Sequence, residues 1–333
     1  MPITTVIPNP NNCDPAICSA TGSRGQVLLK EEKCYNVEDA TAQAYLFPFT
    51  SEGIQAQKNL ITSATIQSNR SVTGLVDGNF DVSGDLNLEL LPEGLELLYK
   101  HGLGTDITTT GSGKYTHVIK ASNLPTSLTY EKGFNDLKEY YRYTGIRVNS
   151  LNFTFPQEGI PTVTASLIGA KEKIYSTNPM DTTPVVPSKQ AFEMRFGKVF
   201  EGSTLAQVAF ITSGNVQITN NIATDEYVIG SPYRVCATEG RRNISGSIEV
   251  LFQNSVMYCK FVDGVDSAIQ FELTNAGGDI FRITVPSVRF SGETPTIDDD
   301  TGIRLTMNFQ GKFSETDNTD LIITLVNDIS TMP

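Results

Sequence analysis

An alternation of apolar and polar residues over 82–90 turns into helical spacing over 91–102, and this is the clearest pattern in the chain. A period of two is typical of a strand with one buried face. The apolar positions are Val82, Gly84, Leu86, Leu88 and Leu90, and the polar positions are Ser83, Asp85, Asn87 and Glu89. The pattern therefore predicts a half-buried strand that leads directly into a helix.

The predicted helix covers residues 91–102. Leu91, Leu95 and Leu98 recur at helical spacing, so we expect them to be packing residues. Pro92 lies in the first turn, where proline is tolerated, and Gly102 is placed to end the helix.

The same strand pattern occurs a second time at 244–252, at an offset of 162 residues. Both copies contain a Ser-Gly pair, so Gly84 corresponds to Gly246, and every apolar position stays apolar. A second helix is expected at about 254–263. Its packing positions, counted from the end of the strand, are Phe252, Val256 and Cys259.

Three further blocks repeat in the same order along the chain. Residues 61–67 match 211–217 at an offset of 150, residues 150–153 match 287–290, and residues 164–169 match 306–311. Matched blocks in one order indicate a tandem duplication. The smaller offset of the first block predicts 12 additional residues in the second copy, and 223–241 is the place for them.

Four segments follow from the turn residues and strand patterns. We expect an N-terminal arm at 1–24, a first domain at 25–175, a proline-rich linker at 176–190 and a second domain at 191–333. Many short strands with few helices predict a mainly β fold. Each domain should be a β-sandwich or partly closed barrel with one flanking short α-helix.

Composition and charge narrow the classes of function. The chain has 333 residues, is 39% hydrophobic and carries a formal net charge of -12, which argues against attraction to nucleic acid or to an anionic membrane face. No apolar run reaches the roughly 18 residues that a membrane helix needs. The N-terminal residues lack the pattern of a signal peptide, so we expect no export and reduced cysteines.

Residue patterns for catalysis or metal binding are weak. His101 and His117 are the two histidines, and no catalytic triad motif, phosphate loop or paired Cys-x-x-Cys accompanies them. Cys13 and Cys18 have no second cysteine pair with which to hold a metal. The acidic run 298–300 lacks the spacing of a calcium loop, so a solvated hairpin tip is the favoured interpretation. We expect no enzyme, no cofactor and no metal.

The carboxylates Asp85 and Glu89 lie on one face of the predicted strand. Four residues along a strand separate them by roughly 13 Å, too far for glycoside chemistry.

The blocks quoted above carry a resemblance to a known family. Residues 61–70, 78–84, the strand and helix that end at 102–104, and the block 145–151 resemble the major tail tube proteins of long-tailed bacteriophages, in particular those with a duplicated tail-tube domain. The resemblance extends from about residue 26 to residue 312.

The resemblance implies a structural role in the virion. Six β-sandwich domains would form a ring, so three duplicated chains would form a pseudo-hexameric ring, and stacked rings would conduct DNA into the host. The implied partners are further copies of this chain and the tail tip, tape-measure and tail terminator proteins. Genomic DNA would pass without specific binding, and no membrane would be bound. The implied place is the tail of the virion, assembled in the host cytoplasm.

Two alternatives stay open on the sequence alone. One is a tube subunit of a secretion or contractile injection system. The other is a β-sandwich module that binds carbohydrate or acts as an adhesin, since modules carried by phages also lack a signal peptide.

Two sets of residues are candidates for function. The matched glycines Gly84 and Gly246 indicate either a close approach of neighbouring backbone or a bulge. The polar strand face is expected to line the lumen of the tube. The candidates on that face are Asp85, Asn87, Glu89 and Glu249.

Overall fold

The computed structural model describes residues 20–68, 70–297 and 302–333, and its fold is mainly β, as predicted. The strands are joined in one large antiparallel sheet that is not closed. The strands of the first half are β1 (Gly25–Glu32), β2 (Tyr45–Leu46), β3 (Ser51–Glu52), β4 (Gln55–Thr62), β5 (Leu75–Glu89), β6 (Asp106–Ser112), β7 (Lys114–Lys120), β8 (Ser127–Phe134), β9 (Glu139–Phe155), β10 (Thr162–Gly169) and β11 (Lys171–Ser176). Those of the second half are β12 (Lys198–Glu201), β13 (Ala206–Gln207), β14 (Ile211–Thr219), β15 (Asn243–Leu251), β16 (Asp266–Thr274), β17 (Ile280–Gly292), β18 (Arg304–Gly311) and β19 (Ile322–Asn327).

The predicted strand at 82–90 is the second part of β5. Val82, Leu86 and Leu88 are fully buried while Asp85 is exposed, so the alternation in the sequence corresponds to a core face and an open face. In the described part of the chain, the helices are α1 (Glu96–Leu103), α2 (Val256–Val262) and the short 3-10 turns η1 (Gly22–Arg24) and η2 (Met194–Phe196). Of the predicted arm, residues 1–19 lie outside the described residues.

Helix α1 begins later than the sequence predicted. Gly94 has a φ of 92°, a left-handed conformation that a helix cannot include, so residues 91–95 form a bend and the helix starts at Glu96. Its end lies at Gly104, where the backbone N–H bonds to the carbonyl of Lys100. Gly102 lies inside the helix, where a Cβ atom would overlap the side chain of Leu151. The reason for this glycine is therefore close packing on β9.

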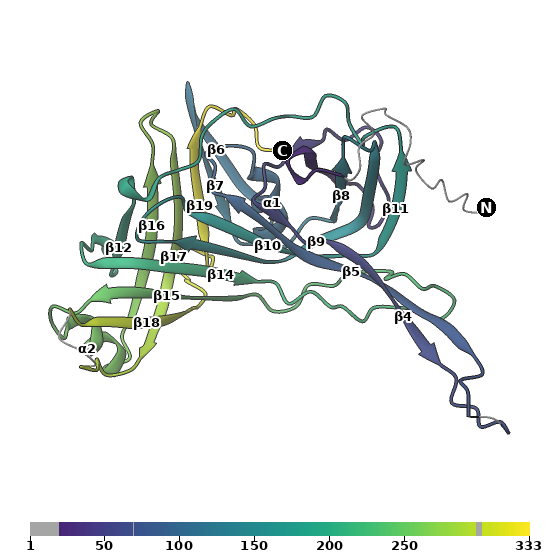
Figure 1. Cartoon of the computed structure of the whole chain (residues 1–333). Coiled ribbons are helices and arrows are strands. Elements are labelled where there is room, and N and C mark those ends of the chain that lie inside the picture. The colour runs from purple at the N-terminus through teal and green to yellow at the C-terminus, as the bar shows by residue number, and fades with distance from the viewer. Residues whose placement is uncertain (1–19, 69, 298–301) are drawn as a thin grey trace.

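Eight strands form a continuous layer that crosses both halves, and we call it the shared sheet. Its order is β4–β5–β10–β9–β14–β15–β18–β17 (Figure 1). The junction between the halves is the antiparallel pairing of β9 with β14, in which Ser150 lies opposite Thr219 and Phe155 lies opposite Gly214. One apolar face of this sheet faces α1 and a core that continues through both halves.

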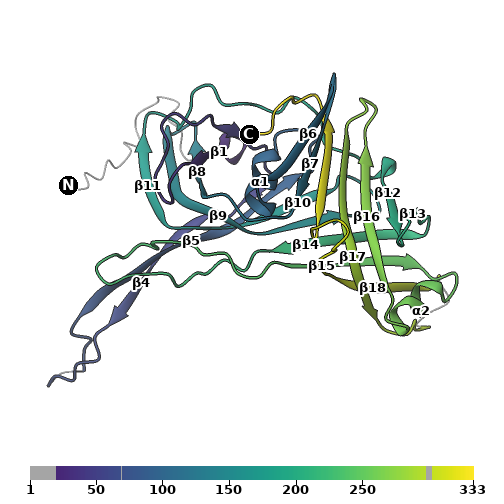
Figure 2. The same cartoon turned by 180° about the vertical axis from the view of Figure 1, so that it is seen from behind.

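Two further groups of strands cover the core. The first part of β9 pairs with β8 and β11, and β1 extends that group. The first part of β17 pairs with β16 and β19. Strand β7 of the first half then pairs with β19, so the β6–β7 hairpin completes the outer strands of the second half (Figure 2). The division predicted between 25–175 and 191–333 is thus crossed by two strand pairings.

The predicted linker at 176–190 is held along the first half. Val185 exchanges backbone hydrogen bonds with Ala44 and Leu46, and Ser188 donates to the carboxylate of Glu93. These bonds hold the segment against the first half, and we call it the strap.

Strand registers correct the repeat inferred from the sequence. Gln55 lies opposite Ser83 and Gln217 lies opposite Ser245, so both strands preceding the repeated one correspond at the offset of 162. The match of 61–67 with 211–217 at an offset of 150 is therefore wrong, and so are the 12 additional residues. The pairing of the strands decides which residues of the two halves correspond. Similar residue types in two segments do not specify that pairing.

The segment 223–241 therefore has a counterpart in the first half. The same number of residues joins Gln55 to Ser83 and Gln217 to Ser245. In the first half this connection is the long β4–β5 hairpin, which projects far beyond the body of the molecule (Figure 1). In the second half it is an irregular loop.

Glu96 generates a prediction about stability. Its carboxylate, 3% exposed, accepts hydrogen bonds from the backbone N–H of Gly94 and from Nδ2 of Asn327, yet burial outweighs them and raises the pKa of Glu96 to about 7. Between pH 4.5 and about 7, the carboxyl group of Glu96 stays protonated in the folded chain, whereas in the unfolded chain it has lost its proton. The free energy of unfolding therefore falls, by roughly 3 kcal/mol, as the pH rises through this window.

We expect Glu96→Gln to remove this contribution. Relative to the unsubstituted protein, the variant should gain stability progressively between pH 4.5 and 7, measured by chemical denaturation at each pH. Glu315→Gln, at an exposed site, is the matched control and should show no such trend. A Glu96→Gln variant with an unchanged pH profile would contradict the assignment.

Candidate functional site

The open face of the shared sheet is polar across six strands. Strand registers place its side chains in rows, because residues directly opposite one another share a face. The rows are Asp85, Ser166, Ser150, Thr219 and Asn243; Asn87, Thr164, Asn152, Gln217, Ser245 and Gln310; Glu89, Thr162, Thr154, Asn215, Ser247 and Asn308; and Ser213, Glu249 and Thr306. All four residues predicted for the lumen lie on this face.

Across these six strands the rows contain three carboxylates and no lysine or arginine. In β17, Arg289 lies opposite Gln310 on the same face and pairs with Asp266. Arg304 stands beside the last row, with its guanidinium 3.0 Å from the carboxylate of Glu249. A hydrogen bond from Thr212, 2.8 Å long, and the charge of Arg304 lower the pKa of Glu249. Asp85 and Glu89 have no such cation in the rows, so the face is weakly negative.

Some polar side chains of this face bond to one another. Asn87 accepts a 2.6 Å hydrogen bond from Thr164 and donates a 2.8 Å bond to Ser51. Asn215 accepts bonds from the backbone N–H and the hydroxyl of Ser247. The face is thus largely composed of neutral amide and hydroxyl groups, which attract an anion weakly.

The matched glycines lie where strands approach closely. A Cβ atom at Gly84 would overlap the carbonyl oxygen of Gly53, and one at Gly246 would overlap that of Asn215. Gly53 and Asn215 are themselves 162 residues apart, like the two glycines. The β5–β10 and β15–β18 registers run without a shift through both sites, which favours close approach over a bulge.

The predicted packing residues differ between the two copies. Leu91, Leu95 and Leu98 are buried in the core beside α1. Cys259 is exposed, so within one chain it does not occupy a buried place like that of Leu98, and the proposed correspondence of the two helices is wrong at this position. The side chain of Val256 lies outside the described residues.

Each end of the shared sheet has an unpaired edge. In the described part of the chain, β4 pairs with β5 alone, which leaves its outer edge open. At the other end, residues 290–292 of β17 pair with β18, and no described strand lies on their other side. Exposed strand edges recruit further strands, so these two edges are candidate contact surfaces.

Both histidines are held by structural partners. Nε2 of His101 lies 3.0 Å from the carboxylate of Glu31, and burial lowers the pKa of this histidine despite that carboxylate. His117 is fully buried and contacts the hydroxyl of Thr109 and the carbonyl of Ile329. In the described ranges no group of three or more His, Cys, Asp or Glu is placed to hold a metal ion. Cys13, Cys18 and residues 298–300 lie outside those ranges.

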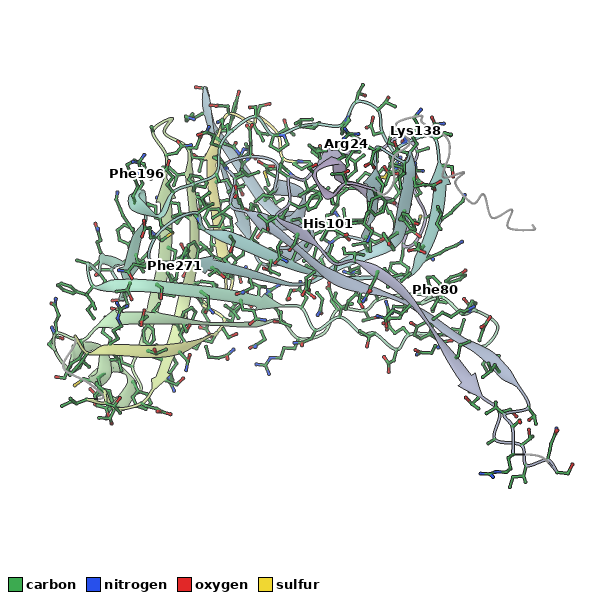
Figure 3. The ribbon with its side chains drawn as sticks, viewed as in Figure 1. Arg24, Phe80, His101, Lys138, Phe196 and Phe271 are labelled. Carbon is green, nitrogen blue, oxygen red and sulfur yellow. The ribbon has the colours of Figure 1, made fainter. Side chains whose placement is uncertain are left out.

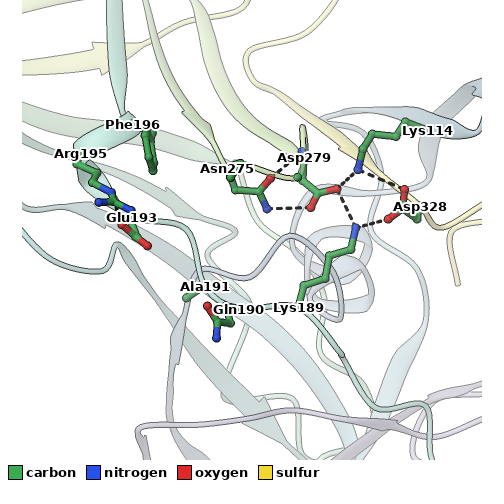
Figure 4. A pocket seen from close by; sticks show the side chains of 12 residues that line it. Lys114, Lys189, Gln190, Ala191, Glu193, Arg195, Phe196, Asn275, Asp279 and Asp328 are labelled. Carbon is green, nitrogen blue, oxygen red and sulfur yellow. Dashed lines mark hydrogen bonds and ion pairs between the residues drawn. The ribbon is translucent and has the colours of Figure 1, made fainter.

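A pocket beside the strap contains a cluster of opposite charges. Lys189 from the strap and Lys114 from the β6–β7 turn both bond to Asp279 and Asp328 (Figure 4). Asp279 is 2% exposed, and although burial opposes it, the two ammonium groups lower its pKa. The four charges neutralise one another, so this cluster ties the strap and the two halves together.

The sequence model of the family described as "Phage tail tube protein" matches residues 22–311, which is most of the chain. The chain belongs to this family. A comparison with curated proteins finds no match.

Phage tail tube proteins are structural and non-enzymatic, and they assemble with themselves into a tube within the tail of the virion. The membership confirms the resemblance seen in the sequence and favours a tube protein over a carbohydrate-binding module. Among the described helices none is long and apolar enough to cross a membrane.

Sequence reasoning missed the β9–β14 junction, the two open edges and Arg234, which is 1% exposed. One signal was present for the correspondence of the two connections, though not for the junction: Gln55 and Gln217 lie 162 residues apart, which is the offset of the repeated strands. The edges had no signal, because they are defined by which strands are absent beside them.

The glycine geometry generates a prediction. Gly84→Leu should prevent folding, because any side chain there meets the carbonyl of Gly53, which cannot move without breaking the pairing of β4 with β5. Soluble yield and circular dichroism measure the result. Gly22→Leu, at a site with nothing near its Cβ position, is the control and should fold normally. A Gly84→Leu protein with unchanged stability would contradict the close approach.

Proposed function

We propose that three copies of this chain form a pseudo-hexameric ring and that the rings stack into the tail tube through which DNA passes. The observation that carries the proposal is the β9–β14 junction. Inside one chain, a strand of the first half already joins a strand of the second half in regular register. The same kind of junction between chains would use the two open edges of the shared sheet.

The internal junction supplies the register for the junction between chains. Residues 55–57 of β4 pair with one copy of the repeated strand, and residues 217–219 of β14 pair with the matched positions of the other copy. The two sets of residues therefore correspond. Asn87 and Glu249 are matched positions of the repeated strand. On their other side they lie opposite Thr164 and Thr306, so these two threonines correspond. Two residues further along, Ser166 lies opposite Ser150 and Asn308 lies opposite Ser291. Ser291, and not Ser287 as the sequence match had it, therefore corresponds to Ser150.

Carrying the internal register over gives specific contacts. Gln217 lies opposite Asn152 and Ile218 lies opposite Leu151. By correspondence, Ala56 of one chain lies opposite Gly292 of the next chain, with Gln55 opposite Glu293 and Gln57 opposite Ser291. Such an interface joins two different surfaces head to tail, which produces a closed ring when the rotation per copy is a whole fraction of a turn.

The correspondence of registers in the two halves supports a tandem duplication. If both junctions are equivalent, each half turns the sheet by the same angle, and six halves from three chains close the ring. Closure removes both strand edges, which would otherwise be aggregation hazards.

The polar face supports a role as the channel wall. An antiparallel sheet can be packed on one face and solvated on the other. In a ring, the solvated face of such a sheet can point into the channel. A wall that conducts DNA must not bind it, and phosphate binding is driven by Lys and Arg. On this face the arginines of the β17–β18 end, Arg289 and Arg304, are paired with Asp266 and Glu249. Asp85, Asn87, Glu89 and Glu249 are thus the proposed lumen residues.

Further partners follow from family membership rather than from a described contact. We propose that the tube ends contact tail tip and tail terminator proteins, that the lumen holds the tape-measure protein before ejection, and that assembly takes place in the host cytoplasm.

A pair of cysteines tests the ring. Ala56→Cys combined with Gly292→Cys should form disulfides between chains, because directly opposed residues of adjacent strands have Cβ atoms about 5 Å apart. Gly292 has room for the added side chain. Non-reducing electrophoresis of oxidised assemblies should show bands up to the covalent trimer and none larger. Either single substitution is the control and should give no ladder. A ladder reaching six chains would refute the stoichiometry.

Lysines on the polar face test the channel. Asp85→Lys with Glu89→Lys should leave tubes intact but slow DNA delivery by at least about tenfold at low salt, with recovery at high salt, because the added charges bind phosphates and salt screens them. Phage complemented with the variant provides the measurement. Asp106→Lys with Glu315→Lys, at exposed sites outside the shared sheet, should deliver DNA normally. Normal delivery by the Asp85 and Glu89 variant would exclude this face as the wall.

A further inference from the structure

The loop 223–241 of the second half lies against the base of the projecting β4–β5 hairpin of the first half. The backbone N–H of Phe80 in β5 donates a 2.8 Å hydrogen bond to the carbonyl of Pro232. The hydroxyl of Tyr227 donates a 3.0 Å bond to the carbonyl of Phe80. The ring of Tyr233 packs edge-on against that of Phe80, with centroids 5.6 Å apart. Figure 3 marks Phe80 at the point where the hairpin leaves the body.

Arg234 anchors this contact. Its side chain is 1% exposed, and its guanidinium lies 2.7 Å from the carboxylate of Asp81, the residue after Phe80. It also donates to the carbonyls of Thr224 and of Gly169, the last residue of β10. One buried cation thus joins the loop, the hairpin base and the shared sheet. A buried guanidinium is costly unless its donors are satisfied, so this arrangement favours one geometry over others.

The hairpin needs such support because its own contacts are few. Beyond Phe80 it is a two-stranded ribbon, which is marginally stable by itself in water. Its arms and tip present exposed apolar side chains to solvent. These are Leu60, Ile61, Ile66, Val72, Leu75 and Val76.

We propose that the loop 223–241 is a brace that sets the direction of the hairpin, with Arg234 as its positioning residue, and that a braced hairpin is required for one ring to engage the next. The second part of this inference rests on the proposed function. The loop and the hairpin are counterparts of equal length, and only the hairpin projects. A ring of three chains therefore presents three hairpins where six halves would otherwise present six. Stacked rings are then held in a threefold register, repeating every third of a turn.

Arg234→Met tests the brace, and Arg241→Met, at an exposed arginine of the same loop, is the matched control. In the purified chain, hydrogen exchange of the Phe80 amide should become at least tenfold faster in Arg234→Met, while the Leu88 and Phe153 amides of the shared sheet keep their rates. Electron microscopy of the same protein should show rings that do not stack into tubes. Arg241→Met should match the unsubstituted protein in all three measurements.

A milder double variant tests the brace if Arg234→Met does not fold. Asp81→Asn with Tyr227→Phe removes two contacts with the hairpin and leaves the bonds of Arg234 to the two carbonyls in place. An unchanged Phe80 amide in this variant would overturn the brace. Fast exchange at Phe80 together with tubes of normal length would overturn its role in stacking. Failure of the unsubstituted protein to form rings would count against the proposed function, whereas the exchange result bears on the brace alone.

Discussion

The pairing of β9 with β14 is the constraint on which the rest of this structure depends. It converts the sheets of two halves into one sheet with one register. Because side chains alternate along a strand, a slip of β14 by one residue against β9 would move Val216 from the core to the wet face and bring Gln217 inside. The continuous polar face and the common core therefore follow from this single register.

Long strands connect that sheet to the layers above it. β9 pairs first with β8 and β11 and then with β10 and β14, so one strand belongs to both layers. β17 has the same role in the second half. The β7–β19 pairing and the salt bridges of Asp279 with two lysines close the outer side. The halves are thus held together at several points.

The two halves use equal stretches of chain for different purposes. Where the first half extends a ribbon, the second half folds its connection back around Arg234 and onto Phe80. The two connections therefore differ while the strand pairings on either side of them agree. These connections carry the exposed apolar residues, such as Ile66 and Ile229, that a neighbouring copy would cover.

The sequence by itself determined the strand at 82–90, the matched glycines Gly84 and Gly246, the mainly β class and the family. These features are local. An alternation of apolar and polar residues, and a glycine where the backbone leaves no room for Cβ, can be seen directly in the sequence. Only the tertiary structure decided the helix start at Glu96, the exposure of Cys259, the register of β4 and the placement of residues 223–241 against Phe80. Each of these depends on which distant backbone lies alongside, as Gly53 does beside Gly84 and Pro232 beside Phe80. Residue types limit such partners without specifying them, because many polar and apolar neighbours satisfy the same alternating pattern.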